Sequence, residues 1–146
     1  MVKLTVAWIG KTKDRAIQEL TDKYLERLTH YVNVEALPLK DDARLLKLSE
    51  GKSERHTLIA LDSRGKQLSS EGLAEFLRSH RDRGSAHLVF AIGGADGLSD
   101  QVQNTAEFTV SLGKMTLSHE LARVVLLEQL YRAFTILKGH PYHVGH

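Results

Sequence analysis

The last ten residues, "LKGHPYHVGH", concentrate side chains that can exchange protons or bind a metal. His140, His143 and His146 recur at every third residue, and Tyr142 lies beside His143. Histidine titrates near neutral pH and, when neutral, ligates metals, so the spacing allows proton transfer or metal binding. The tail contains no carboxylate to support a metal site. The residues alone leave a frayed end, a metal site and a catalytic tail open, and we expect no metal.

The segment before the tail, residues 119–138, is predicted to form one long helix that is apolar on nearly every side. One face of a sheet cannot bury so much apolar surface, and the economical second partner is a copy of the same helix. We therefore expect a homodimer through this helix. Among its polar residues, Glu128 and Arg132 have the spacing of an ion pair, while Arg123 and Arg132 are candidates for contact with an anion.

Two glycine-containing turns follow predicted strands. The turn "IGGADGLSD", residues 92–100, permits close backbone approach, but it lacks both the dinucleotide-binding and the P-loop spacing of glycines. The segment "SLGKMTLSHE", residues 111–120, places Leu112, Met115 and Leu117 in a loop that should be solvated. Apolar side chains in a loop indicate a pocket or a buried crossing.

The rest of the chain alternates strands with helices. We predict strands at 3–10, 32–39, 56–63, 86–94 and 106–113, and helices at 14–31, 41–51, 69–81 and 119–138. This alternation is typical of an α/β fold with a mainly parallel sheet, helices on both faces, and ligands at the carboxyl ends of the strands.

Composition sets the class of protein. A length of 146 residues with 42% hydrophobic residues predicts a single domain, 1–146. The chain has no cysteine, which excludes disulfides and thiolate chemistry, and no apolar stretch approaches the roughly 18 residues of a membrane span. We therefore expect a cytoplasmic protein without membrane association. The formal net charge of +2 permits a polyanionic partner without requiring one.

Three stretches of the sequence together resemble a known family. They are "FAIGGADGLSD", "SLGKMTLSHELARVVLLEQLYRAF" as a loop-and-helix pattern, and "GHPYH". They are similar to SPOUT-class RNA methyltransferases that methylate N3 of a pseudouridine in large-subunit ribosomal RNA, and the similarity extends over the whole chain. The resemblance implies an α/β knot, in which the C-terminal segment threads a loop, and S-adenosylmethionine as cofactor. Periodicity could not have indicated a knot, because knots are very rare among folds.

The resemblance also implies a set of site residues. The cofactor site falls on Leu61, Gly93, Leu112, Gly113, Lys114, Met115, Thr116 and Leu117. The backbone of such a loop can hydrogen-bond an adenine edge while its apolar side chains cover the ring. The implied partners are ribosomal RNA in the assembled ribosome and a second copy of the chain, which completes the site near the twofold axis.

The chemistry of the implied reaction suggests roles for the tail. The protein must align N3 with the methyl donor, remove the imide proton and stabilise the resulting anion. We expect His143 to act as base or base relay, Tyr142 to contact the pyrimidine, and Arg123 or Arg132 to stabilise charge.

Two alternatives remain. The family usually carries a basic residue where this chain has Val144, which leaves open a ribosome-binding or assembly factor without catalysis. The second alternative is a methyltransferase that acts on another RNA.

Overall fold

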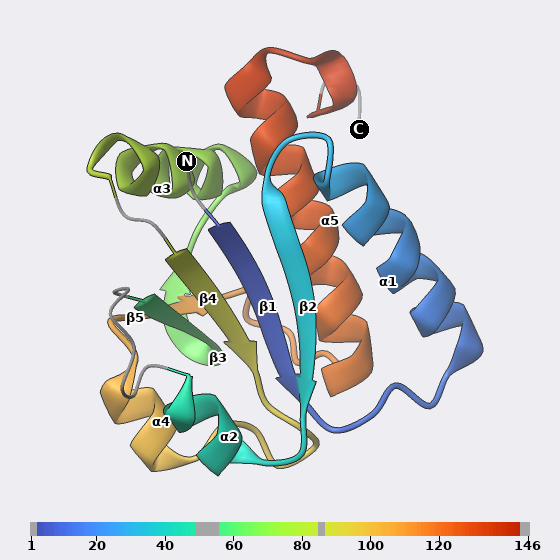
Figure 1. Ribbon diagram of the computed structural model, residues 1–146, viewed down its shortest axis with the longest axis vertical. Helices are drawn as coiled ribbons and strands as arrows, with labels where there is room; N and C mark the ends of the chain where they lie inside the picture. Colours follow the sequence, from blue (N-terminus) through green and yellow to red (C-terminus); the bar gives the residue numbers. More distant parts are fainter. Residues whose placement is uncertain (1–2, 49–55, 85–86, 144–146) are drawn as a thin grey trace.

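The computed structural model describes residues 3–48, 56–84 and 87–143, without the side chain of His143. Its centre is a five-stranded sheet with the order β2-β1-β4-β3-β5, in which all neighbouring strands are parallel (Figure 1). The strands are β1 (Lys3–Ile9), β2 (Asn33–Leu39), β3 (His56–Gln67), β4 (His87–Ile92) and β5 (Phe108–Ser111). The predicted parallel α/β sheet is therefore confirmed.

Helices cover both faces of the sheet, as predicted. The helices are α1 (Arg15–Leu28), α2 (Asp42–Lys47), α3 (Ser70–Asp82), α4 (Asp100–Thr105), α5 (His119–Lys138) and the 3₁₀ turn η1 (Pro141–His143). α5 packs between α1 and α3 on one face, where Leu126, Leu127 and Leu130 join the larger apolar core. α2 and α4 cover the other face through Leu45 and Val102 (Figure 1).

Side chains in the preceding loops define where the helices begin. Asp14 accepts a hydrogen bond from the backbone N–H of Ala16 at 2.8 Å, and Ser118 accepts one from that of Leu121 at 3.3 Å. Each satisfies a backbone donor that the first turn of a helix leaves without a partner. At the other end of α5, Gly139 adopts a left-handed conformation with φ of 72°, which favours glycine.

The structure corrects several predicted boundaries. α4 was not predicted, because a six-residue helix with one buried side chain has too little periodicity to detect. α2 ends at Lys47 rather than Gly51, and Gly51 lies outside the described residues. β3 continues past residue 63, since Leu61 and Lys66 both pair with Val110 around an irregularity. The tail, for which we predicted no helix or strand bounds, contains η1.

No helix among the described residues combines the length and the apolar character needed to cross a bilayer.

Candidate active site

A pocket of about 440 Å³ opens at the carboxyl ends of β4 and β5, beside residues 61–63 of β3. The loops that follow these strands form most of its wall. Its lining includes seven of the residues that the family resemblance implied for the cofactor site: Leu61, Gly93, Leu112, Gly113, Met115, Thr116 and Leu117. Lys114, predicted with them, does not line the pocket. The volume lies within the range of small-molecule sites.

The turn after β4 has a shape that needs glycine. A Cβ atom on Gly93 would lie 2.3 Å from the carbonyl carbon of Gly97, so no other residue fits without moving the backbone. Gly97 has φ of 77° and donates its N–H to the carbonyl oxygen of Gly94 at 2.9 Å. The turn therefore folds back on itself, and its glycines let the backbone come close to a ligand in the pocket.

The loop after β5 is fastened at its start and apolar beyond it. Ser111 accepts a hydrogen bond from the N–H of Gly113 at 3.0 Å and donates one to its carbonyl oxygen at 2.8 Å. Leu112 and Leu117 are half-buried at the pocket, whereas Met115 is 86% exposed. The apolar residues that looked misplaced in a loop thus belong to the wall and rim of the pocket.

Sequence reasoning missed part of the lining. Asp62, Ser63, His119 and Ala122 also line the pocket. A hydrogen bond from Arg64, with Nε 2.9 Å from Oδ1, holds the pKa of Asp62 below its usual range. The available signal was an acidic residue where the buried part of β3 ends, because ligands of parallel sheets gather toward the carboxyl ends of the strands.

The tail forms a hydrogen-bonded cluster with α5. The hydroxyl of Tyr142 donates to Oε2 of Glu128 at 2.9 Å, and Nη2 of Arg132 donates to the same oxygen at 2.7 Å. Burial, and next the hydrogen bond to Glu128, raise the pKa of Tyr142. The guanidinium of Arg132 also lies over the Tyr142 ring, 4.9 Å from its centroid. Tyr142 therefore stays neutral near pH 7 and is held at a fixed position.

Arg123, predicted to stabilise charge at the reacting atoms, has a different environment. Its side chain is 0% exposed and lies over the Trp8 ring, 5.1 Å from the centroid. It donates to the carbonyl oxygen of Ile9 at 3.1 Å and to Oγ1 of Thr12 at 2.9 Å. Burial lowers its pKa. Arg123 does not line the pocket, and its contacts support the β1–α1 connection instead.

The histidines of the tail are only partly described. His140 contacts the hydroxyl of Tyr31 through Nδ1, while the side chain of His143 and all of Val144 and His146 lie outside the described residues. In the part of the chain that the structure describes, no group of three His, Asp or Glu side chains could hold a metal.

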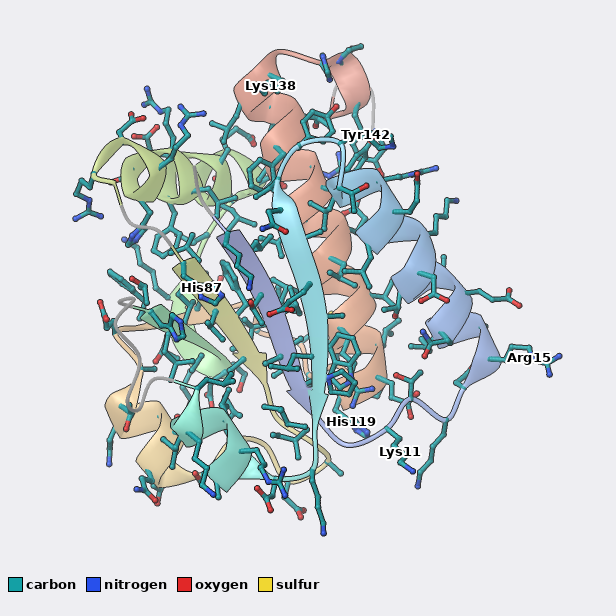
Figure 2. All side chains as sticks on the ribbon, viewed as in Figure 1. Lys11, Arg15, His87, His119, Lys138 and Tyr142 are labelled. Carbon is teal, nitrogen blue, oxygen red and sulfur yellow. The ribbon has the colours of Figure 1, made fainter. Side chains whose placement is uncertain are left out.

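The pocket and the tail lie at opposite ends of α5. His119 and Ala122, in the first turn of this helix, line the pocket, whereas Tyr142 follows its last turn. A helix of 20 residues is about 30 Å long. Figure 2 shows Tyr142 and His119 at the two ends of the molecule. The structure thus does not bring the predicted catalytic and cofactor residues together within one chain.

Comparison with known proteins places this arrangement in a family. The model of a family described as "Predicted SPOUT methyltransferase" matches residues 2–143. The chain is 55% identical over 146 residues to ribosomal RNA large subunit methyltransferase H of Koribacter versatilis, with 99% of this chain and 100% of the relative covered. It is 43% identical over 155 residues to the protein of that name from Geotalea daltonii, with 97% and 99% covered.

Solved structures share the fold at low sequence identity. The SpoU methyltransferase AviRb from Streptomyces viridochromogenes, in complex with the cofactor AdoMet, matches 93% of this chain with a TM-score of 0.58 and 14% identity. This chain spans 58% of the length of that solved chain. A probable methylase family protein from Haemophilus influenzae matches 96% of this chain and 70% of its own, with a TM-score of 0.60 and 10% identity. The expected SPOUT-type α/β fold is thereby confirmed, and the chain belongs to the SPOUT methyltransferase family, in its ribosomal RNA large subunit methyltransferase H branch.

Proposed function

We propose that this protein transfers a methyl group from S-adenosylmethionine to N3 of a pseudouridine in the ribosomal RNA of the large subunit, in the cytoplasm. The observation that carries the proposal is the full-length identity of 55% to a ribosomal RNA large subunit methyltransferase H. The pocket supports it independently, because it lies where a parallel sheet binds ligands and has a mixed apolar and backbone lining.

The residues of the pocket fit the proposed cofactor. Leu112 and Leu117 offer apolar surface for the faces of the adenine, and the tight glycine turn at Gly93 brings backbone close to the ligand. S-adenosylmethionine, when bound, supplies an already activated methyl group. The protein therefore has to bind the cofactor and the RNA base, align the acceptor nitrogen with the methyl group, exclude water and remove the imide proton.

The separation of pocket and tail supports a homodimer through α5. Side chains along the length of its outer surface stay partly exposed, among them Val125 and Leu121, the latter at 40%, while α1 and α3 pack against the helix. If two α5 helices pack antiparallel, the tail of each chain reaches the first turn of the other. The catalytic tail then acts in trans, on the cofactor bound by the partner.

Residues of the tail and of the end of α5 supply the remaining catalytic groups. We assign His143 as the base or base relay for the imide proton, and Arg132 as the cation that stabilises the developing anion. Tyr142 contacts the pyrimidine as a neutral phenol, because its raised pKa prevents it from acting as a phenolate base. We do not assign Arg123 to charge stabilisation, because its side chain is fully buried and does not line the pocket.

The experiment is transfer of labelled methyl from S-adenosylmethionine to ribosomes that lack the modification. Free ribosomal RNA and tRNA serve as parallel substrates, and mass spectrometry identifies the labelled nucleotide. Label at N3 of a large-subunit pseudouridine is the expected result. Label on tRNA would indicate another substrate, and cofactor binding without transfer to any RNA would indicate an assembly factor. His143→Ala should retain cofactor binding and lose transfer; an unchanged rate would remove His143 from the mechanism.

A further inference from the structure

The connection between β1 and α1, residues 10–14, lies beside the cofactor pocket and is not part of its lining. It begins at Gly10, whose φ of 95° turns the chain and whose N–H donates to the carbonyl oxygen of Leu39 at 2.9 Å. It ends at Asp14, the cap of α1. We call residues 10–14 the β1–α1 loop.

The first turn of α5 holds the β1–α1 loop in place through two side chains of opposite charge. Oε1 of Glu120 accepts from the backbone N–H of Lys13 at 3.0 Å and from that of Asp14 at 3.2 Å. Arg123 donates to Thr12 and to the carbonyl oxygen of Ile9 just before the loop. A loop fastened at its start, middle and end loses little conformational entropy when it binds a partner.

The same contacts join the loop to the pocket. His119, which precedes Glu120, lines the pocket. Gly94, also in the lining, packs against Ile9, since a Cβ on Gly94 would lie 3.6 Å from the Ile9 carbonyl oxygen. A substrate that places its base at the pocket therefore passes close to the loop.

The loop and the start of α1 carry three exposed cations: Lys11, Lys13 and Arg15. Among the described residues, none of the three forms an ion pair. The nearby carboxylates of Asp14 and Glu120 already accept backbone N–H groups. Figure 2 shows Lys11 and Arg15 projecting away from the ribbon at the end of the molecule that carries His119. Arg15 places a positive charge in the first turn of α1, where the helix dipole is also positive, so it does not stabilise the helix. The presence of a cation at this position therefore needs another explanation.

We propose that the β1–α1 loop, with Lys11, Lys13 and Arg15, binds the phosphodiester backbone of the RNA substrate and holds the target nucleotide at the pocket. The proposal deepens the proposed function and rests on it. Unpaired cations on a preorganised backbone suit phosphate groups, and such contacts position an RNA without reading its sequence. Because the net charge of the chain is only +2, its overall charge attracts RNA weakly. The local group of cations next to the site therefore matters more for binding RNA than the overall charge does.

The test compares two variants with the same change in charge. Lys11→Gln with Lys13→Gln removes two loop cations, while Arg81→Gln with Arg83→Gln removes two exposed cations at the end of α3, near the opposite ends of the strands. Binding to unmodified large ribosomal subunits is measured over a range of salt concentrations. Methyl transfer is measured separately, and calorimetry with S-adenosylmethionine checks the pocket.

The loop variant should bind the subunits about 10-fold more weakly at moderate salt, with a salt dependence reduced by about one unit of log–log slope per lost phosphate contact. Its KM for the subunits should rise while cofactor affinity and dimer size stay unchanged. The α3 variant should behave like the wild type. Arg15→Gln should weaken binding in the same direction as the loop variant.

Equal loss of affinity in both double variants, or unchanged affinity and salt slope in the loop variant, would overturn the proposal. A change in the oligomeric state of the loop variant would also overturn the proposal, because it would show that the loop contacts a second protein chain. Failure of the proposed function is distinguishable, because wild-type protein would then bind subunits without methylating them while the effect of the loop on binding could still be measured.

Discussion

The hydroxyl of Tyr142 donates a hydrogen bond of 2.9 Å to the carboxylate of Glu128, 14 residues earlier in the chain. The same carboxylate oxygen accepts from Arg132 at 2.7 Å. Glu128 therefore joins the tail to α5 and fixes two residues to which we assign roles in the reaction, although we assign it no contact with the substrate.

Replacing Glu128 should lower the rate of methyl transfer through loss of this positioning. We expect kcat of Glu128→Ala to fall by up to about 100-fold, because small misplacements of catalytic groups cost that much. Glu128→Gln retains an acceptor oxygen and should fall less. Single-turnover transfer to ribosomes measures the effect, and calorimetry should give an unchanged affinity for S-adenosylmethionine. Wild-type kcat in Glu128→Ala would exclude the positioning role.

If the tail acts in trans, two inactive variants should restore activity when they share a dimer. Tyr142→Ala removes the ring of the tail, and Gly94→Leu adds a large side chain at a position of the pocket lining where a Cβ meets only ordinary contacts. Randomly mixed dimers should recover about a quarter of the wild-type activity, since half of them are mixed and each of those has one intact site. Separate tags on the two chains show that mixed dimers form, and dimers purified through both tags should reach about half of the wild-type activity, because one of their two sites is intact. No recovery, with mixed dimers present, would place the tail in cis.

Much of the fold could be predicted because local signals agreed with one another. The predicted bounds of α5, 119–138, agree with the structure, because Ser118 caps its start and Gly139 ends it. The pocket loop 112–117 was found by its unusual apolar residues, although its link to a cofactor came from resemblance. α4 was missed because six residues with a single buried side chain resemble an ordinary loop.

The relation between distant parts could not be predicted in the same way. The role of Arg123 depends on Ile9 and Thr12, more than 100 residues away, and no pattern along the chain indicates that pairing. The separation of Tyr142 from the pocket likewise follows from the direction of α5 relative to the sheet. A sequence shows which residues can do chemistry, whereas the packing of helices decides which of them meet.

His80 should make stability depend on pH. Within the described ranges neither of its buried ring nitrogens has a hydrogen-bond partner, and its ring packs against those of Phe76 and Phe108. Burial, and next the charge of Arg83, lower its pKa, with Glu107 opposing the shift. The folded state therefore binds a proton at His80 less readily than the unfolded state does. Neutral His80 contributes fully to the free energy of unfolding above about pH 6.5, and this contribution is lost as the pH falls through the lowered pKa of the folded state.

His80→Leu should remove this component and flatten the dependence of the free energy of unfolding on pH below about 6.5. Urea denaturation at a series of pH values gives the measurement. His30→Gln is the matched control, because His30 is an exposed histidine that pairs with Glu26 on the surface. Identical pH profiles for His80→Leu and the wild type would mean that His80 does not carry the effect.

Arg123→Met should destabilise the protein although it changes no residue of the pocket lining. The substitution removes the donors to the Ile9 carbonyl oxygen and the Thr12 hydroxyl, as well as the cation over Trp8. Loss of such a buried network costs about 2–4 kcal/mol in the free energy of unfolding, which urea denaturation can measure. Arg81→Met, at an exposed cation, should change the free energy of unfolding by less than about 1 kcal/mol.

Because Arg123 holds the β1–α1 loop, Arg123→Met should also bind ribosomal subunits more weakly while its affinity for the cofactor is retained. If the variant instead kept full stability and lost catalysis, Arg123 would have to act at the reacting atoms.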